Sequence, residues 1–456
     1  ENISVVFLCY TIINIKIKGS DFMKILDLII KKRDGMKLSK EEIDFFVKGV
    51  TDGTIPDYQT SAMLMAIYFR GLDDDETALL TIAMAHSGKI FDLSEIKGIK
   101  VDKHSTGGVA DTTTLILAPL TASVGLPIVK MSGKGLGFSG GTQDKLNSIP
   151  GFNVDIDENH AIEYAKKTNI VLMSQNNELT PADKKLYELR DVTGTVESLP
   201  LIASSIMSKK IAAGADAIVL DVKCGSGAFM KDIDSAKKLA NIMVAIGKNA
   251  GRNVRAIITS MSQPLGNYIG NSLEVIEAIE VLKGNVKGDL LDVTLKLGAH
   301  MLMLANITDK EDTAIKILKE NIENKKGLEK FREMIIQQGG NPNIIDNYSL
   351  LPHCEHEYKV ISEYSGYITE TNTALIGRAS LETGAGRSYK EQELDYGAGI
   401  IMKKRIGDKV EKGETIALIY SSSEEKCVSA EEFIKKAIKI EKDKKEIPPL
   451  ILDTII

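Results

Sequence analysis

The sequence predicts an α/β protein with a small discontinuous helical domain, a larger α/β domain with a mixed or parallel sheet, and a C-terminal lipoyl-like α+β segment. Three observations predict this architecture. The chain has 456 residues, which is too long for one ordinary hydrophobic core. Apolar residues recur at helical spacing from residue 23 to about 87 and again near 190. Elsewhere, short β-branched runs alternate with glycine-rich loops and helices, which is typical of a mostly parallel sheet.

The composition limits the classes of partner. A net charge of −6 argues against a broad nucleic-acid surface, and the 43% hydrophobic and 26% charged residues are ordinary for a globular protein outside membranes. The cysteines are scattered and form no CxxC pair, so neither a disulfide framework nor a zinc site is indicated. We therefore expect a cytoplasmic protein that binds neither nucleic acid nor membrane.

The order of these patterns divides the chain into domains. Residues 1–22 read as an upstream extension before a natural start at Met23, because their apolar stretch is too short to span a bilayer; the alternative is an extra strand. The remaining boundaries are placed where the sequence changes between helical apolar spacing and alternating strands, loops and helices. We expect a helical domain at 23–90 and 182–215, an α/β domain at 91–181 and 216–352, and a C-terminal α+β domain at 353–456.

The helical domain has local signals of its own. Ser39 and Glu42 form a capping box ahead of an apolar helix, and residues 60–71 and 75–88 repeat an apolar face at three- and four-residue spacing. Residues 186–214 are helical again, and we expect them to pack against the N-terminal helices. That return makes the domain discontinuous.

The α/β domain is predicted from repeated strand–loop–helix units. The expected strands, each followed by a polar or glycine-rich loop, are 98–103, 126–131, 215–223 and 254–260. In a parallel sheet these loops all lie at the carboxyl ends of the strands, where ligands bind.

The C-terminal segment is predicted to contain alternating strands. Residues 399–420 carry turn signals at Gly407-Asp408 and Lys412-Gly413, as in small lipoyl-like barrels. The tail, 429–450, reads as a charged amphipathic helix that ends at the prolines.

The loop "KHSTGG" at 103–108 is suited to an anion. Its glycines let backbone N–H groups approach an anion closely, and the helix that follows directs its positive end to the same point. Lys103 adds a charge, Ser105 a hydroxyl donor, and Thr114 a second hydroxyl from inside the helix. The alternative is a plain strand-to-helix turn.

A second loop, "KMSGKGLGFSGGT" at 130–142, weakens that alternative. It again supplies a lysine, Lys130, with the hydroxyls of Ser132 and Thr142 and a run of glycines. Two such loops after adjacent parallel strands can surround one phosphate from both sides.

Other polar residues suggest a reaction partner for the phosphate. Arg190, Ser205 and Lys209 lie in apolar surroundings, and the last two share a helix face. An arginine with a lysine can hold a carbonyl-bearing group and stabilise negative charge that develops on it. The alternative is a pair of exposed cations bound to Glu197 or Asp191. His104 is either a proton donor or a residue that only lines the site and forms hydrogen bonds there.

Taken together, these stretches resemble the pyrimidine-nucleoside phosphorylases, the family that includes thymidine phosphorylase. The likeness runs from Met23 to about Ser423. It is carried by "KKRDG", "KHSTGGVADTTTL", "SGKGLGFSGGTQDKLNSIPGF", "LYELRDVT", "VESLPLIASSIMSKK", "DVKCGSGAFMK" and "GAGRSYK".

The resemblance implies a homodimer, whose interface and pyrimidine side belong to the helical domain. It also implies inorganic phosphate as co-substrate, no catalytic cofactor, and a structural potassium ion. The phosphate ligands would be Lys103, Ser105, Thr114, Lys130, Met131, Ser132 and Thr142. The pyrimidine would be held by Arg190, Ser205 and Lys209, with His104, Arg190 and Lys209 as the catalytic residues. Potassium would be bound by Ala110, Thr112, Leu265, Tyr268 and Glu277, although positions 110 and 268 usually hold Gly and Ala.

The implied reaction is phosphorolysis of uridine, thymidine or deoxyuridine to a free pyrimidine and an α-pentose 1-phosphate, in pyrimidine salvage. Phosphate attacks C1′ while Arg190 and Lys209 stabilise the departing base. Lys130 resembles the bacterial branch that accepts both uridine and thymidine.

One loop departs from the family pattern. It has Lys134 for the usual Arg, Phe138 for His, Ser139 for Thr and Asn147 for Glu. Because the expected phosphate ligands are kept, we predict an active enzyme, weakened by these changes.

Two alternatives to the phosphorylase remain. An anthranilate-type phosphoribosyltransferase has a similar architecture but needs carboxylates for magnesium pyrophosphate, which the loops lack. A non-catalytic carrier or binding module is suggested by the lipoyl-like segment, but "IYSSSEEK" offers no typical modification site.

Overall fold

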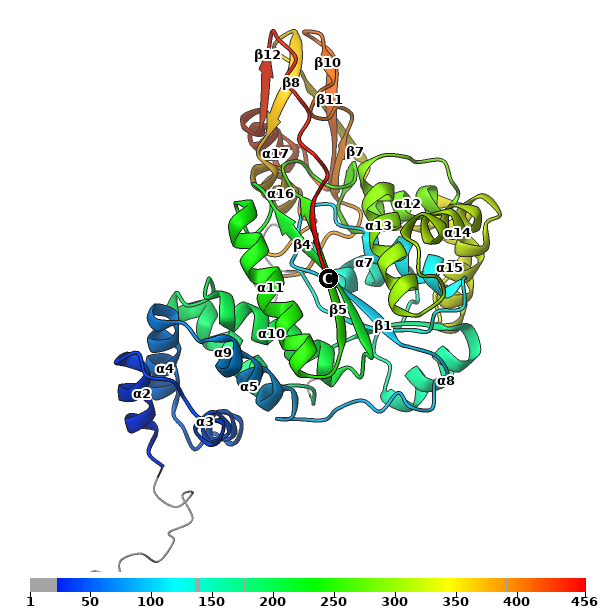
Figure 1. Ribbon diagram of the computed structural model, residues 1–456. Coiled ribbons are helices and arrows are strands. Elements are labelled where there is room, and N and C mark those ends of the chain that lie inside the picture. Colours follow the sequence, from blue (N-terminus) through cyan, green and yellow to red (C-terminus); the bar gives the residue numbers. More distant parts are fainter. Residues whose placement is uncertain (1–22, 136–139, 176–177, 390–391) are drawn as a thin grey trace, which may run out of the picture. The chain divides into compact units, whose positions relative to one another are not determined.

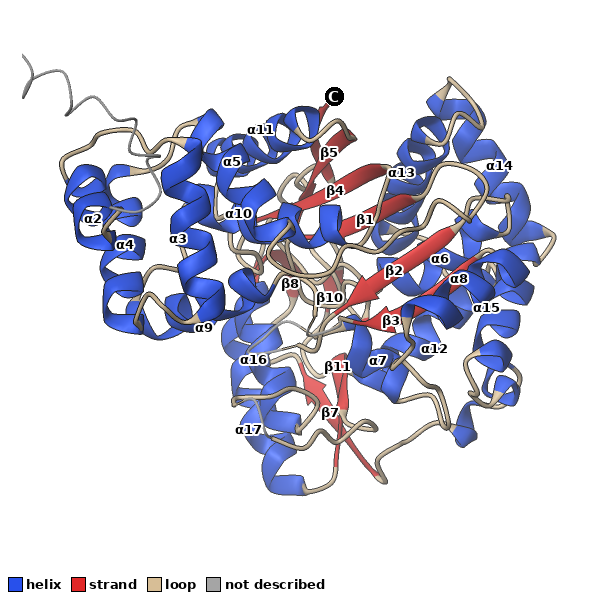
Figure 2. Cartoon of the chain, turned by 90° about the horizontal axis from the view of Figure 1, so that it is seen from below, coloured by secondary structure: helices blue, strands red, loops and turns tan. Residues whose placement is uncertain are grey.

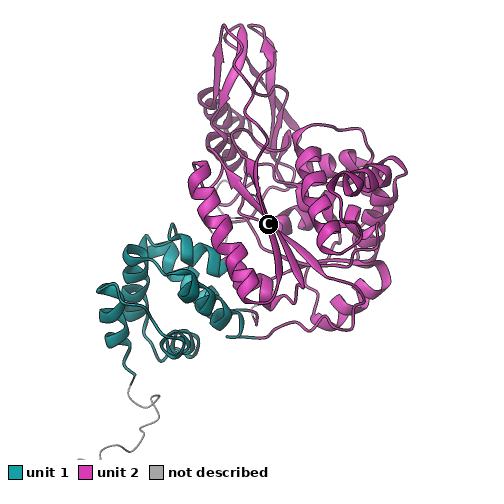
Figure 3. Cartoon of the chain, in the orientation of Figure 1, with its two compact units in different colours: residues 1–88, 180–205 teal, residues 89–179, 206–456 magenta. Residues whose placement is uncertain are grey.

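The computed structural model describes residues 23–135, 140–175, 178–389 and 392–456 (Figure 1). The chain divides into two compact units, coloured separately in Figure 3. Unit 1 comprises 1–88 and 180–205, and unit 2 comprises 89–179 and 206–456. The expected extension, 1–22, lies outside the described residues. Residues 206–215, which we assigned to the helical domain, fall in unit 2, because the division cuts through helix α10 (Leu199–Ala212).

Unit 1 is helical, as its apolar spacing predicts. Its elements are α2 (Ile25–Arg33), α3 (Lys40–Asp52), α4 (Asp57–Arg70), α5 (Asp74–Ala85), α9 (Pro181–Thr193) and the start of α10. The capping box is confirmed, since the Ser39 side chain accepts from the Glu42 N–H and the Glu42 carboxylate accepts from the Ser39 N–H. Leu186 and Leu201 join the same core as Phe46 and Leu64, so the second segment packs on the first.

The central sheet of unit 2 is mostly parallel. Its strands, in spatial order, are β1 (Val101–Ser105), β4 (Ala217–Cys224), β5 (Asn253–Ser260) and β13 (Ile451–Ile455). The pairs β1–β4 and β4–β5 are parallel, while β13 is antiparallel to β5. Helices α11 (Ile233–Asn249) and α13 (Asp289–Leu304) pack against its strands (Figure 1).

A second pair of parallel strands, β2 (Ile128–Ser132) and β3 (Ile170–Ser174), lies beside β1. Figure 2 shows β2 and β3 continuing the row of β5, β4 and β1. We expected β1 and β2 to be neighbours in one sheet; instead they belong to different hydrogen-bonded sheets. They are nevertheless adjacent, and Lys130 Nζ on β2 donates to the Lys103 carbonyl oxygen on β1 at 2.5 Å.

The remaining helices of the α/β part surround these strands and complete a large apolar core. They are α6 (Thr113–Ala122), α7 (Thr142–Asn147), α8 (Glu158–Thr168), α12 (Asn271–Leu282), α14 (Glu311–Glu323) and α15 (Lys326–Gln337). Helix α6 is buried along its whole length, from Thr113 to Ala122. A continuous apolar run such as this one is what full burial requires.

The C-terminal part of unit 2 has two small sheets and two helices. One sheet has the strand order β10 (Lys409–Val410), β8 (Gly366–Thr371) and β12 (Ile438–Glu441). The other has the order β6 (Tyr268–Ile269), β9 (Gly399–Met402), β11 (Thr415–Ser421) and β7 (His356–Ile361). Helices α16 (Thr373–Thr383) and α17 (Glu424–Ala437) pack on each other. The interpretation of 429–450 as one helix was wrong: α17 ends at Ala437, and the chain continues as β12 because β8 offers it a partner.

None of the helices in the described ranges is both long and apolar enough to span a bilayer.

Candidate active site

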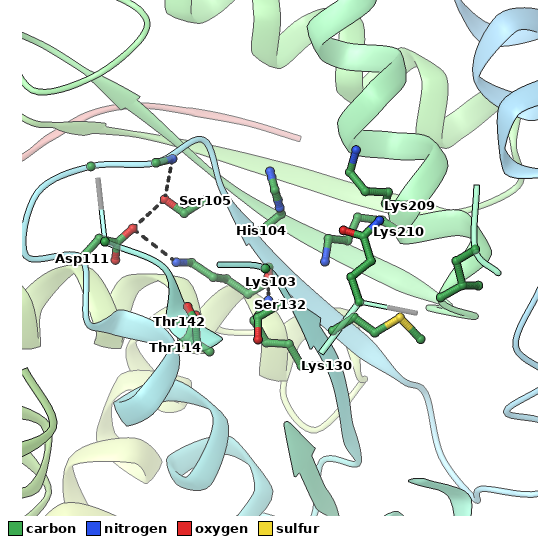
Figure 4. Close-up of a pocket in the computed structure, with 17 residues that line it drawn as sticks. Lys103, His104, Ser105, Asp111, Thr114, Lys130, Ser132, Thr142, Lys209 and Lys210 are labelled. Carbon is green, nitrogen blue, oxygen red and sulfur yellow. Dashed lines mark hydrogen bonds and ion pairs between the residues drawn. The ribbon is translucent and has the colours of Figure 1, made fainter. Parts of the chain in front are cut away.

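A pocket of about 200 Å³ lies at the carboxyl ends of β1 and β2 (Figure 4). It brings together nine of the residues that the sequence singled out. These are Lys103, His104, Ser105, Thr114, Lys130, Met131, Ser132, Thr142 and Lys209. The same pocket is also lined by Asp111, Gln175, Leu179 and Lys210, with Gly107, Gly108, Gly133 and Gly140 from the two loops. All of them belong to unit 2.

Lys103, on β1, is buried and held by three oxygen-bearing side chains. Its Nζ donates to Thr113 Oγ1 at 2.6 Å and lies 3.4 Å from Asp221 Oδ2 and 3.8 Å from Asp111 Oδ2. Lys223, 2.7 Å from Asp221, adds a second buried cation behind it. Two buried lysines, Lys103 and Lys223, are thus balanced by two aspartates, Asp111 and Asp221. The ammonium group of Lys103 lines the pocket, and its charge is paired within the protein.

Asp111 connects this cluster to the glycine loop. Its Oδ2 accepts from Ser105 Oγ at 2.6 Å, and Ser105 Oγ in turn accepts from the Gly107 N–H at 3.2 Å. Gly107 has a φ of +95°, a conformation that favours glycine. Burial alone would raise the pKa of the Asp111 carboxyl, but Lys103 and Lys223 hold that pKa well below its usual value. Asp111 is therefore an anion that orients the Ser105 hydroxyl.

Lys130, on β2, is the centre of a second buried cluster. Its Nζ lies 3.3 Å from Asp102 Oδ1, and Lys210 Nζ lies 2.7 Å from Asp102 Oδ2. Burial, together with the nearby Lys210 and Lys103 and against the opposing effect of Asp102, lowers the pKa of Lys130 to about 8. Near neutral pH Lys130 is thus protonated but close to its titration point.

The charges on the wall of the pocket favour an anion. Four lysines line it, Lys103, Lys130, Lys209 and Lys210, against the single carboxylate of Asp111. The start of α6 adds the positive end of a buried helix, with Thr114 in its first turn. A compact, doubly charged anion such as phosphate fits this field and the hydroxyls around it.

His104 lies on the pocket wall between these lysines (Figure 4). Burial lowers the pKa of its imidazole well below the usual value, and Lys210, Lys130, Lys209 and Lys103 lower it further. The ring is therefore neutral at physiological pH, and a neutral ring has one N–H to donate and one nitrogen to accept.

Arg190 and Ser205 belong to unit 1. Arg190, on α9, is 2% exposed, so the alternative of an exposed cation was wrong. Its guanidinium donates to three backbone carbonyls, those of Thr195 at 3.2 Å, Leu201 at 3.1 Å and Val196 at 2.6 Å. These bonds tie the segment between α9 and α10 to the helical core. Ser205 is buried and lies on α10, one turn before Lys209.

The residues expected to bind potassium lie around one turn of unit 2. The Ala110 carbonyl accepts from the Gly266 N–H at 3.1 Å, and the Glu277 carboxylate accepts from the N–H groups of Asn267 at 2.7 Å and Tyr268 at 3.3 Å. A Cβ on Gly266 would clash with Glu277 Oε2, so the carboxylate is in contact with that backbone. Burial raises the pKa of Glu277 to about 7.

The donors in that turn are oxygens, which alkali and other hard cations prefer. They comprise backbone carbonyls, among them those of Ala110 and Thr112, and the Glu277 carboxylate. Thr112 and Glu277 are fully buried, and the Thr112 hydroxyl donates to Glu274 Oε2 at 2.6 Å. Ala110 has a φ of +54°, which explains why glycine suits that position. The Leu265 carbonyl already accepts from Arg405 Nη2 at 3.3 Å. These oxygens are of the type that a monovalent cation takes, and the Ala110 and Leu265 carbonyls among them already accept hydrogen bonds within the protein.

Sequence reasoning missed several charged residues of the site. Asp102, Asp221 and Lys223 are fully or nearly fully buried on β1 and β4, and their ion pairs join residues far apart in the chain. No motif near them in the sequence predicts these ion pairs. The one general signal is a charged residue within an otherwise apolar strand, which indicates that the charge is buried and paired. Lys210 was passed over in favour of its neighbour Lys209, and both line the pocket. Phe138 and Ser139 lie outside the described residues, whereas Lys134 is described and exposed.

Comparison with known proteins gives the architecture three matches. Residues 26–88 match the glycosyl transferase family helical bundle domain, and 97–328 match the glycosyl transferase family a/b domain. Residues 367–441 match the pyrimidine nucleoside phosphorylase C-terminal domain. A solved structure, anthranilate phosphoribosyltransferase from Thermus thermophilus, superposes with a TM-score of 0.56 at 17% identity over 68% of this chain and 99% of its own. That likeness shows the fold alone.

Curated relatives are much more similar in sequence. Pyrimidine-nucleoside phosphorylase from Staphylococcus haemolyticus is 54% identical over 91% of this chain and 95% of its own. Proteins of the same name from Staphylococcus epidermidis and Staphylococcus aureus are 55% and 54% identical over 88% of this chain and 93% of theirs. With this identity over nearly the whole length, the chain belongs to the pyrimidine-nucleoside phosphorylase family of glycosyl transferases.

Proposed function

We propose that this protein is an enzyme that cleaves pyrimidine nucleosides with inorganic phosphate. The observation that carries the proposal is the pocket itself. Four lysines, hydroxyl side chains and two glycine loops converge on a space that suits phosphate, in a chain that is 54% identical to a pyrimidine-nucleoside phosphorylase. The expected substrates are uridine, thymidine and deoxyuridine, and the products are a free pyrimidine and an α-pentose 1-phosphate.

The reaction needs no nucleophilic side chain, because phosphate is the nucleophile. A phosphate oxygen forms a bond to C1′ as the bond from C1′ to the base nitrogen breaks, and the bonding electron pair leaves with the base. Lys103 and Lys130 hold the phosphate, with Ser132, Thr114 and Thr142 as its hydroxyl donors and Met131 on the wall. Ser105, whose hydroxyl donates to Asp111 in this structure, becomes a donor when that hydrogen turns to the phosphate. The bound dianion then faces the sugar as it becomes cationic, which lowers the barrier electrostatically.

The base leaves with negative charge, and we assign its stabilisation to Arg190 and Lys209, with Ser205 as a hydrogen-bonding partner. His104 acts as a neutral hydrogen-bond donor to a base carbonyl, because its depressed pKa excludes a resident imidazolium. His104 keeps this proton throughout, and the departing base, which leaves as an anion, takes its proton from water.

A structural potassium ion is part of the proposal. Its expected ligands are Ala110, Thr112, Leu265, Tyr268 and Glu277. The hydrogen bonds that join the Ala110 carbonyl and the Glu277 carboxylate to residues 266–268 support it. When bound, the ion would offset the buried Glu277 carboxylate and hold the loop that follows β1. It would take no part in the chemical step.

We also propose a cytoplasmic homodimer. Exposed apolar side chains on α2 and α4, including Leu26 at 55%, Tyr58 at 75% and Phe69 at 76% exposure, support an interface there. Cys224, Cys354 and Cys427 are free, which suits a reducing compartment.

The experiment is product analysis with the purified full-length chain. Uridine, thymidine and deoxyuridine are each incubated with and without phosphate, and base and pentose 1-phosphate are quantified by chromatography. We expect release of base only when phosphate is present. Consumption of phosphoribosyl pyrophosphate with an aromatic amine, without phosphorolysis of any nucleoside, would instead favour the phosphoribosyltransferase. An intact mass carrying a biotinyl or lipoyl adduct would favour the carrier module.

A further inference from the structure

Arg387 reaches the second glycine loop from a distant part of the chain. It follows α16, in the motif "GAGRSYK", and is 8% exposed. Its Nη1 lies 2.8 Å from Asp144 Oδ1 and donates to the Gly135 carbonyl at 3.4 Å, while its Nε donates to the Gln392 carbonyl at 3.2 Å. None of the described pocket-lining side chains is among these partners, so Arg387 has contacts with the loop but not with the phosphate position.

Asp144 completes the arrangement from the first turn of α7. Its Oδ2 accepts from the Gly135 N–H at 2.6 Å. The carboxylate thus bridges Arg387 and Gly135, and both polar groups of Gly135 are held, its N–H by Asp144 and its carbonyl by Arg387.

Gly141 lies directly against the same point. A Cβ on Gly141 would clash with the Gly135 nitrogen, and it would lie 2.5 Å from the Lys134 carbonyl carbon and 2.8 Å from Asp144 Oδ2. The backbone leaving β2 and the backbone entering α7 are therefore in contact at this place. In the sequence, Ser132 and Gly133 come just before Gly135 and Thr142 comes just after Gly141, and all three line the pocket.

We propose that Arg387 and Asp144 form a clamp that positions the two described ends of the second glycine loop, at Gly135 and Gly141, for phosphate, a role that rests on the proposed phosphate site. Nη1 contacts both the Asp144 carboxylate and the Gly135 carbonyl, while Nε of the same plane donates to Gln392, and a lysine with its single nitrogen cannot make both sets of contacts as well. Without the clamp, Ser132 and Thr142 would have to be ordered by the phosphate itself. The cost would appear in phosphate binding and much less in the chemical step, since the loop is ordered once phosphate is bound.

The test uses the full-length chain and inorganic phosphate as the probe. Phosphate affinity is measured by titration calorimetry, and KM and kcat are measured by phosphorolysis of uridine, for the Arg387→Gln, Asp144→Asn and double variants. Arg378→Gln is the matched control, because Arg378 is an exposed arginine of α16 that stacks on Phe433. Circular dichroism and thermal melting verify folding; if Arg387→Gln fails to fold, Asp144→Asn carries the test.

We expect Arg387→Gln to weaken phosphate binding and raise KM for phosphate about tenfold, with kcat within about threefold of wild type. Asp144→Asn should have a similar effect. The double variant should bind phosphate about as tightly as the weaker-binding of the two single variants, because the two residues act as one unit. Arg387→Lys should restore less than half of the lost affinity. Arg378→Gln should bind phosphate like the wild type.

Two results would overturn the clamp. One is an Arg387→Gln variant that folds and binds phosphate within twofold of wild type; the other is a double variant whose effects multiply. Failure of the wild-type chain to bind phosphate at all would be a different result, since it would remove the proposed function together with the clamp.

Discussion

The Nζ atom of Lys130 donates a hydrogen bond to the carbonyl oxygen of Lys103 at 2.5 Å, joining two strands that belong to different hydrogen-bonded sheets. Each strand ends in one of the two glycine loops. Through this bond the loops are held over one pocket, and both lysines line it. The place of the proposed phosphate site thus involves a side-chain contact between the two strands as well as the sheets themselves.

The ionisation of Lys130 predicts a pH limit for phosphate binding. The pKa of Lys130 is lowered to about 8 by burial, so its charge is present below that pH and is lost above it. We expect kcat/KM for phosphate to fall about tenfold per pH unit above 8, because this ratio reports the free enzyme. Lys130→Met should lower kcat/KM and remove this limb, while Lys130→Arg should keep the charge and move the limb to higher pH. A limb that persists in Lys130→Met would assign it to another group.

Lys103 is expected to be the more important of the two lysines, since it is held in place by Thr113, Asp221 and Asp111. Lys103→Ala should reduce kcat/KM for phosphate by about 10² to 10³, the usual effect of removing one preorganised charge. Steady-state phosphorolysis of uridine at varied phosphate measures it. Lys97→Ala, at an exposed lysine shortly before β1, is the control. Rates within threefold of wild type for Lys103→Ala would contradict the site.

Arg190 is predicted to have two separable roles. Its guanidinium donates to three backbone carbonyls, so Arg190→Ala should lower the free energy of unfolding by about 1–3 kcal/mol. The same change should lower kcat/KM for the nucleoside by about 10² if the residue also stabilises the leaving base. Urea denaturation and kinetics report the two effects. In the control, Arg33→Ala, an exposed arginine is removed and neither quantity should change. Loss of stability with normal kinetics would leave Arg190 with a structural role alone.

Potassium is predicted to stabilise the folded chain at the contact between the Glu277 carboxylate of α12 and the backbone of residues 266–268. At matched ionic strength, potassium chloride should raise the melting temperature by several degrees over choline chloride, because an ion that binds only the native state stabilises it. Glu277→Gln should abolish the difference. Equal melting temperatures of the wild type in the two salts would argue against the ion.

The exposed apolar faces of α2 and α4 predict the oligomeric state. Phe69→Glu places a charge where an aromatic ring is 76% exposed, and we expect the mass measured by light scattering to fall from two chains to one. Tyr364→Glu, which changes a similarly exposed aromatic residue of unit 2, should leave the dimer intact. A Phe69→Glu variant that remains dimeric would place the interface elsewhere.

Local patterns were the reliable part of the sequence-based prediction. The capping box at Ser39 and Glu42, the helices of unit 1 and the strands ending at Lys103 and Lys130 all depend on residues close in the chain. The prediction for the tail was wrong because its structure depends on residues that are distant in the chain. Residues 438–441 and 451–455 are strands because β8 and β5 pair with them, and no feature of a lysine-rich tail announces a partner that is far away in the sequence.

By itself the sequence determined the two-part architecture, the glycine loops with their lysines and hydroxyls, and the family. Only the tertiary structure decided how those lysines are charged and aimed. Asp102, Asp111, Asp221 and Lys223 act through ion pairs between segments that are distant in the chain, namely Lys210–Asp102, Lys103–Asp221 and Lys223–Asp111. Burial, which exists only in the folded state, makes His104 neutral and brings Lys130 close to titration.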